Sequence, residues 1–135
     1  MIHCKLFTDI LDHLSYRFSE GEPVAVVMAD ATKLKQVMMS SDAYYYNDAK
    51  VEFHAAALKK GKFEIPLVCP QDDGQITWIE GFHQVGAILD TGVSDIPVST
   101  SVGLAFQLRD LVGSANQEAA RQGYSFSGMK AFFPA

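Results

Sequence analysis

One stretch of the sequence, "WIEGFHQVGAILDTGVSDIPV" from Trp78 to Val98, most constrains what the chain can fold into. It predicts a strand, a tight turn at Gly81, a helix from about His83 to Leu89, and a further strand over "DIPVSTS". Gly92, in "DTG", is the expected end of that helix. Such a close succession of strand, helix and strand indicates a fold that mixes both kinds of element.

A β-hairpin is expected directly before this unit. Its strands, "EIPLVCP" and "QITWIEG", flank "QDDG", a turn signal in which Gly74 can adopt positive φ. Further upstream, "VAVVMA" from Val24 to Ala29 is typical of a short buried strand. Asp30 then provides a suitable N-cap for a helix over "DATKLKQVMMSS".

Apolar residues at helical spacing predict helices in other segments of the chain. These segments are roughly Lys5–Phe18, Ala49–Lys60 and most of Val102–Arg121. The expected inner face of the second helix carries Phe53, Ala56, Ala57 and Leu58. After them, "GYSFSGMKAFFPA" is an aromatic tail that either docks on the body of the protein or meets a partner.

Composition narrows the class of protein. A chain of 135 residues with 48% hydrophobic residues fits one globular domain. The net charge is −5 and the basic residues are scattered, so we expect no strong binding of duplex DNA. Apolar runs are too short for a membrane span, and the N-terminus lacks secretory features. Cys4 and Cys69 form no metal-binding pair, and a cytoplasmic protein is expected.

The ordered features of Glu52 to Ser99 resemble the ParB/sulfiredoxin family. They are a helix, a hairpin with an acidic glycine turn, "EGFHQ", a helix with "GAILDTG", and "DIPV". The resemblance implies one α+β domain over residues 1–135, in which a small mixed sheet carries a β-hairpin flanked by helices. Residues 49–100 match best, residues 1–48 are a family-specific addition, and residues 101–135 supply a C-terminal helix and the aromatic tail. A bacterial, plasmid or phage setting is also implied.

Two positions depart from the family signature at the turn. Sulfiredoxins carry a cysteine just before the histidine, where this chain has Phe82, so their sulfinic-acid chemistry is not expected here. In CTP-binding ParB domains arginines grip the triphosphate, and Gln84 stands at the second of these basic positions. Because charge-assisted hydrogen bonds are roughly twice as strong as neutral ones, we expect a nucleotide to bind weakly.

The turn itself is the main candidate site. The start of a helix offers free backbone N–H groups and a positive dipole end, which suit a phosphate or a nucleotide with Mg²⁺. On this interpretation the ligand-binding residues are Gly81, Phe82, His83 and Gln84. His83 would act as acid or base, with Glu80 orienting it or binding a metal. A structural joint, with Gly81 making the turn and Phe82 filling the core, is the alternative.

Three consecutive tyrosines, Tyr44, Tyr45 and Tyr46, stand in "DAYYYND", which is typical of a loop. Adjacent side chains cannot all face one core, so at least one of them should be exposed. Exposed aromatic residues often anchor a protein partner, and the acidic net charge favours a protein over a nucleic acid. The alternative is that the tyrosines and the aromatic tail close the ends of a small core.

Two hypotheses about function follow. In the first, the chain is a ParB-like regulatory or inhibitory protein that binds a partner protein, with weak binding of a nucleotide or phosphate at Gly81–Gln84. In the second, it is a ParB-like nuclease or phosphotransferase that uses His83 and Glu80 with a divalent metal. The absence of an arginine at position 84 and the acidic charge favour the first.

Overall fold

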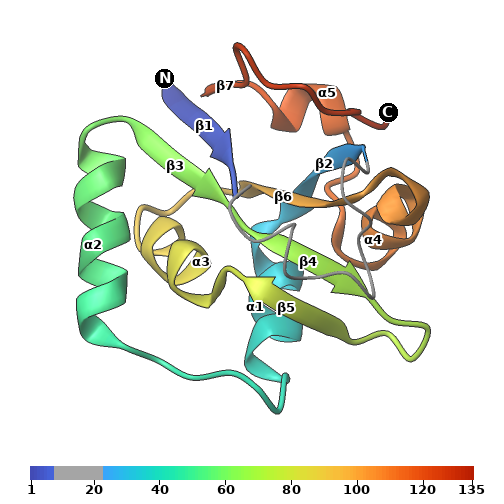
Figure 1. The fold of residues 1–135 in the computed structure, drawn as a ribbon, viewed down its shortest axis with the longest axis horizontal. Helices are drawn as coiled ribbons and strands as arrows, with labels where there is room; N and C mark the ends of the chain where they lie inside the picture. The colour runs from blue at the N-terminus through green and yellow to red at the C-terminus, as the bar shows by residue number, and fades with distance from the viewer. Residues whose placement is uncertain (8–22) are drawn as a thin grey trace.

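The structure, a computed structural model, describes residues 1–7 and 23–135 (Figure 1). Helices and strands are mixed along the chain, which confirms the expected α+β class. The strands are β1 (Ile2–Leu6), β2 (Val24–Asp30), β3 (Lys62–Ile65), β4 (Leu67–Pro70), β5 (Ile76–Glu80), β6 (Asp95–Ser101) and β7 (Tyr124–Ser125). The helices are α1 (Ala31–Met39), α2 (Asp48–Lys59), α3 (Phe82–Leu89), α4 (Ala105–Val112) and α5 (Gln117–Ala120), with a 3₁₀ turn at Val102–Leu104.

The strands form two small sheets. The larger has the order β2-β6-β4-β5, in which β6 runs antiparallel to β2 and parallel to β4. The smaller is parallel, with the order β3-β1-β7. Only Pro66 separates β3 from β4, so one extended stretch leaves the small sheet and enters the large one. Ser99 of β6 holds this corner by donating its backbone N–H to the Pro66 carbonyl at 2.8 Å.

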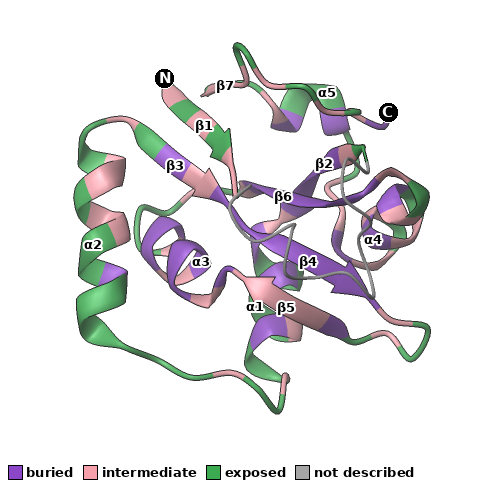
Figure 2. Ribbon diagram, viewed as in Figure 1, coloured by how far each residue is buried: buried purple, intermediate pink, exposed green. Residues whose placement is uncertain are grey.

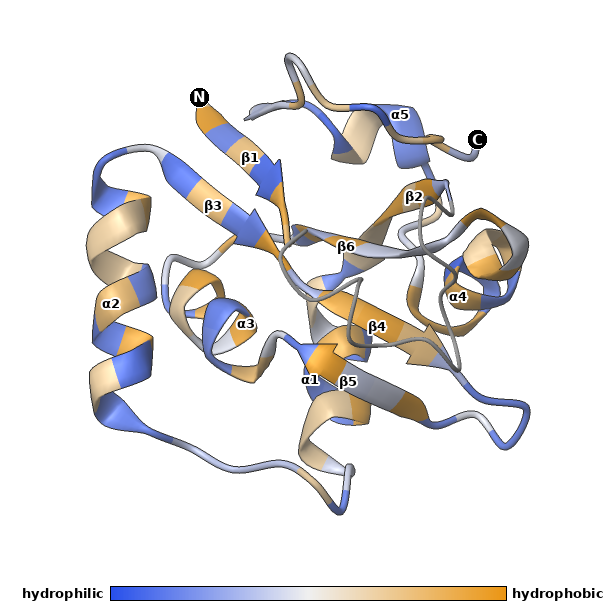
Figure 3. Cartoon of the chain, in the orientation of Figure 1, coloured by the Kyte–Doolittle hydropathy of each residue, from blue (hydrophilic) through white to orange (hydrophobic). Residues whose placement is uncertain are grey.

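The hydrophobic core surrounds the larger sheet. Strands β2, β4 and β6 are buried along almost their whole length (Figure 2), and β2 and β4 are also strongly hydrophobic (Figure 3). Buried apolar side chains from three helices complete the cluster: Leu34 and Met38 of α1, Val85 and Ile88 of α3, and Leu108 and Val112 of α4. Each such side chain contributes roughly 1.5–3 kcal/mol by leaving water.

Most of the local sequence predictions are confirmed. Asp30 caps α1 by accepting a hydrogen bond from the Lys33 backbone N at 3.0 Å. The hairpin β4–β5 turns at Gly74, whose φ is 83°. Helix α3 and strand β6 lie where the sequence places them, and Gly92 follows α3 with a φ of 80°.

The first expected helix is partly corrected. Lys5 and Leu6 belong to β1, which pairs with β3 and β7. The alternation in β1 of exposed His3 and Lys5 with partly buried Ile2, Cys4 and Leu6 is strand spacing, which the helical interpretation overlooked. The remainder of that expected helix, 8–18, lies outside the described residues.

Helix α2 forms as expected, but its expected inner face is only partly right: Leu58 packs against the core and Ala57 is partly buried. Phe53 is 71% exposed and Ala56 is exposed, while Val51 is the buried residue of the helix. Val51 packs on Gly86 of α3, where a Cβ would lie 3.6 Å from the valine Cγ2. The buried face is therefore set by the position of α3, which the sequence of α2 does not reveal.

The C-terminal segment, residues 113–135, is less helical than expected because it pairs with β2. A side chain at Gly113 would collide with the Arg109 carbonyl, and α4 ends there. Gln117 then binds both the backbone N and the carbonyl O of Met28, each at 2.8 Å. The backbone of Phe132 exchanges hydrogen bonds with Val24 and Val26, each at 2.9 Å. The aromatic tail thus docks on the body of the protein.

Within residues 1–7 and 23–135, no helix is both long and apolar enough to cross a lipid bilayer.

Candidate functional site

The candidate site lies at the turn between β5 and α3. Gly81 is the N-cap residue of α3, and no side chain caps this helix end. A Cβ at position 81 would lie 2.5 Å from the Pro66 Cβ and 3.1 Å from the Trp78 ring. Because any side chain there would force its neighbours apart, the close packing of the turn against the β3–β4 corner requires glycine.

His83 lies in the first turn of α3 and is only 3% exposed. Its Nε2 is buried without a hydrogen-bond partner among the described residues. Burial lowers the pKa of the imidazole, as do the nearby Lys50 and His54, while Glu80 acts in the opposite direction. The fold therefore favours the neutral form of His83, whose buried Nε2 can donate or accept a hydrogen bond according to the tautomer.

Glu80 is the last residue of β5 and lies partly buried beside the turn. Its charge raises the pKa values of His83, His54 and Lys50, which places the carboxylate near all three groups. The free Nε2 of His83 is not bonded to it. Glu80 therefore acts on His83 through its charge.

Gln84 is completely buried and faces the smaller sheet. Its Nε2 donates to Oε1 of Glu64 on β3 at 3.1 Å, and the other oxygen of Glu64 lies 3.7 Å from the Lys5 Nζ. The amide donor that the sequence assigns to a phosphate is thus already engaged inside the protein. With Gln84 turned inward and His83 covered, the turn has no open cradle for a nucleotide in this conformation.

The tyrosine loop, residues 40–47, covers the turn. The Tyr44 ring meets the Phe82 ring edge-on at 5.3 Å between centroids. The Tyr45 ring lies edge-on to both Phe82, at 6.0 Å, and His83, at 4.8 Å. Trp78 packs on Phe82 from β5 at 5.2 Å. The turn at Gly81–Gln84 and the three tyrosines, which the sequence presents as separate candidate sites, are therefore in contact and form one site.

An aromatic patch, defined here as Tyr45, Tyr46 and Phe53, lies on the outer side of this loop and of α2. The three side chains are 49%, 59% and 71% exposed, and Figure 2 shows both segments largely exposed. Lys50 donates from Nζ to the Tyr45 hydroxyl at 2.7 Å, and Phe53 follows Lys50 on the same face of α2. Tyr44, by contrast, is partly buried against the core.

Three residues near the turn were not among the candidates from sequence: Lys50, His54 and Glu64. His54 is partly buried on α2, and burial lowers its pKa while Glu64 and Glu80 oppose that shift. Lys50 and His54 belong to α2 and Glu64 to β3, and the packing of both elements on α3 brings them to the turn. No local spacing in the sequence marks them, because the contact depends on the tertiary fold.

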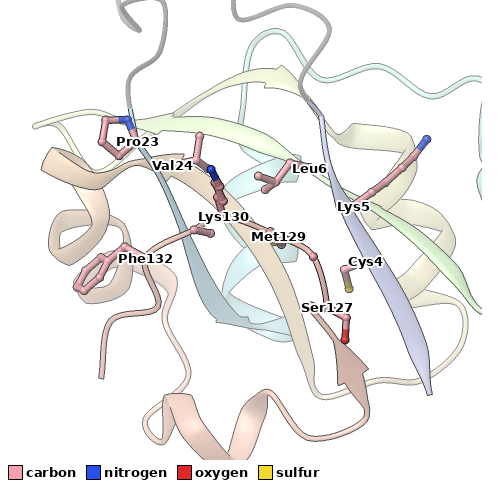
Figure 4. Close-up of a pocket in the computed structure, with 11 residues that line it drawn as sticks. Cys4, Lys5, Leu6, Pro23, Val24, Ser127, Met129, Lys130 and Phe132 are labelled. Carbon is pink, nitrogen blue, oxygen red and sulfur yellow. The ribbon is translucent and has the colours of Figure 1, made fainter.

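A separate groove of about 940 Å³ lies between β1, the start of β2 and residues Ser127–Phe132 (Figure 4). It is lined mainly by apolar side chains such as Leu6, Val24 and Met129. Its two lysines, Lys5 and Lys130, point away from each other in Figure 4. The groove contains no residue of the turn or the tyrosine loop.

Among the described residues, no three His, Cys, Asp or Glu side chains are grouped as ligands for a metal ion. The chain matches no protein-family model, and no curated protein or solved structure is significantly similar to it.

Proposed function

We propose that this chain is a ParB-like regulatory or inhibitory protein that binds a partner protein through its aromatic patch. The observation that carries the proposal is the exposure of Tyr45, Tyr46 and Phe53 on adjoining segments, with Tyr44 anchored beneath them. Tyrosine is enriched among the residues that dominate binding energy at interfaces, and two rotatable side-chain bonds keep its entropy cost low. An anchored loop that presents such rings is suited to recognition.

The charges around the patch indicate the chemistry of the partner. Partial desolvation and the nearby carboxylates of Asp48 and Asp90 raise the pKa of the Tyr46 hydroxyl. Lys50, beside the patch, donates its ammonium group to the Tyr45 hydroxyl. A partner that surrounds an apolar pocket with basic side chains complements this surface, and such complementarity speeds association.

The test of this proposal compares capture of a partner by the wild type, by a Tyr45→Ala/Tyr46→Ala double variant and by Phe106→Ala. Phe106 is a matched control, since it is 53% exposed on α4, outside the patch. We expect one protein to be retained by the wild type and by Phe106→Ala and lost with the double variant. Equal retention by all three would refute binding through the patch.

Weak binding of a nucleotide or phosphate at Gly81–Gln84 remains part of the proposal. The uncapped start of α3 and the unpartnered His83 Nε2 support it, and the burial of His83 and Gln84 limits its strength. Calorimetry with nucleotides, with and without Mg²⁺, tests it on the wild type and on His83→Ala. Weak heats that disappear in the variant are expected, whereas unchanged heats would place the binding elsewhere.

A second candidate function is a nuclease or phosphotransferase that uses His83 and Glu80 with a divalent metal. The observation that favours it is the carboxylate of Glu80 close to a neutral imidazole, a pairing that suits general acid–base chemistry. Hydrolysis of single-stranded nucleic acid or of nucleotides with Mg²⁺ tests it. Activity that Glu80→Gln and His83→Ala both abolish is expected under this hypothesis, and an inactive wild type contradicts it.

A further inference from the structure

We infer that Tyr45 is a lid over His83, so that a partner which takes up Tyr45 also uncovers the imidazole. The inference deepens the proposed function. It rests on that proposal only in one respect, the partner protein that would displace Tyr45. The covering contact itself belongs to the fold of this chain. It would make access to the turn depend on occupancy of the aromatic patch.

The position of Tyr45 carries the first step of the argument. Tyr45 is about half exposed, while its ring packs edge-on against His83 and Phe82, at 4.8 Å and 6.0 Å between ring centroids. A ring that serves a partner and covers His83 at once cannot keep both contacts if the partner draws it outward. Partner binding and coverage of His83 are therefore coupled through one side chain.

The state of His83 carries the second step. Its Nε2 is buried without a partner in the described part of the chain. A buried polar atom left unpartnered destabilises the closed arrangement, whereas water or a ligand would satisfy it once the ring moves away. The conformation with Tyr45 packed on His83 is thus less stable than one in which the His83 Nε2 has a hydrogen-bond partner.

The attachment of the loop carries the third step. The ends of the loop are fixed: Ser40 caps α1 through its backbone N–H, and the Asn47 side chain accepts from the Lys50 backbone N at 3.1 Å. Between these ends, the Tyr45 ring packs on Phe82 and His83. Lys50 donates to the Tyr45 hydroxyl and also lies over its ring, at 5.1 Å from the centroid. Side-chain contacts of this kind can be exchanged for a partner's without unfolding either helix.

Carbethoxylation with diethyl pyrocarbonate tests the lid, because the reagent modifies accessible, neutral imidazoles. The rate at each histidine is followed by mass spectrometry in the free protein, so that no partner is needed. For Tyr45→Ala we expect His83 to react about tenfold faster, the factor that corresponds to losing one aromatic contact. Exposed His3 on β1 should react at an unchanged rate.

Two variants serve as matched controls. Tyr46→Ala removes a somewhat more exposed neighbour, while the ring contact to His83 comes from Tyr45, so the His83 rate should stay unchanged. Tyr45→Phe keeps the ring and removes only the hydroxyl that binds Lys50, so the rate should stay near that of the wild type. Partly buried His54 reports general loosening, and should not follow His83 in Tyr45→Ala.

The lid is overturned if Tyr45→Ala leaves His83 as slow as in the wild type. It is equally overturned if Tyr46→Ala accelerates His83 to the same extent, or if His54 and His83 accelerate together. Failure here leaves binding through the patch standing, since the capture experiment measures that separately. If no partner is captured, a rate increase at His83 that is specific to Tyr45→Ala still supports the lid.

Discussion

The tyrosine loop and the C-terminal segment are both rich in aromatic residues, yet they are held to the protein in different ways. The C-terminal segment pairs with β2 through backbone groups: Ser114 with Met28, and Phe132 with Val24 and Val26. The tyrosine loop is held at its centre by the rings of Tyr44 and Tyr45. Aromatic residues therefore lie in a segment that extends the larger sheet in one region, and in a loop that presents exposed rings in the other.

This difference distinguishes an aromatic segment that the fold needs from one that is available for binding. Segment 113–135 covers an edge strand, which would otherwise leave a row of backbone groups unpaired. Its removal would damage the fold. The tyrosine loop leaves the rings of Tyr45 and Tyr46 about half exposed, so its loss should affect binding before stability.

The largest expected effect comes from Gln117→Ala in the C-terminal segment. The change leaves the buried N–H of Met28 without its acceptor, while the Met28 carbonyl loses the amide donor and keeps only the Ser114 N–H. One unsatisfied buried donor, together with the other hydrogen bonds lost from the Gln117 amide, destabilises the protein by about 3 kcal/mol. Denaturant unfolding should show this loss, while Gln122→Ala, at an exposed position, should leave the midpoint nearly unchanged.

Gly81→Ala should have the next largest effect on stability. It tests the packing of the turn on which the tyrosine loop lies. The added Cβ would overlap Pro66 and Trp78 and force the turn away from the β3–β4 corner. We expect a loss of about 2 kcal/mol in unfolding free energy, as for other overpacked sites. Gly103→Ala is the control, since a Cβ there meets no atom within 4 Å. Equal losses in both variants would contradict the packing argument.

Acidification should lower the unfolding free energy through two histidines near the tyrosine loop, His54 and His83. Burial is the main cause that lowers the pKa of both His83 and His54. The fold therefore favours their neutral forms, and their contribution is complete above the ordinary histidine pKa of about 6.5 and declines as the pH falls below it. Lys50 adds to the shift at His83, while Glu80 opposes it at both residues and Glu64 opposes it at His54.

The C-terminal segment contains no histidine, so the two histidines responsible for the loss, His54 and His83, lie on α2 and α3. Denaturant unfolding from pH 7 to pH 5 measures the decline. A His54→Gln/His83→Gln double variant should show a flatter profile. A profile as steep as that of the wild type would assign the pH dependence to other groups.

Tyr46→Ala should have the smallest effect on stability. Its side chain is 59% exposed, and substitutions at such sites usually change the unfolding free energy by no more than about 0.5 kcal/mol. Binding of the captured partner should nevertheless weaken. A large loss of stability would mean that the loop, like the C-terminal segment, is part of the framework.

The elements that the sequence predicts well are those with local signals. Asp30 as a cap, Gly74 in the hairpin and Gly92 after α3 each act through backbone geometry within a few residues. The inner face of α2 was wrong at Phe53 and Ala56, because Gly86 of α3 decides which residue of α2 can approach it. The strand β1 was overlooked because the helical spacing that begins at Leu6 hid its short alternation, which the pairing with β3 and β7 shows to be a strand.

The candidate site was predictable only in part for the same reason. The turn at Gly81 and the tyrosines were visible as unusual local patterns, and each was considered alone. Their contact through Phe82 and His83 depends on how the loop between α1 and α2 crosses α3. The inward turn of Gln84 depends on Glu64 of β3, which no nearby residue indicates.

Native-state amide hydrogen exchange tests the contrast between the two aromatic regions most directly. The amides of Ser114 and Phe132, bonded to Met28 and Val24, should exchange slowly, by openings close to global unfolding. The amides of Tyr45 and Tyr46 should exchange much faster, by local movement of the loop. Loop amides as well protected as Ser114 and Phe132 would contradict the account and make the tyrosine loop part of the rigid core.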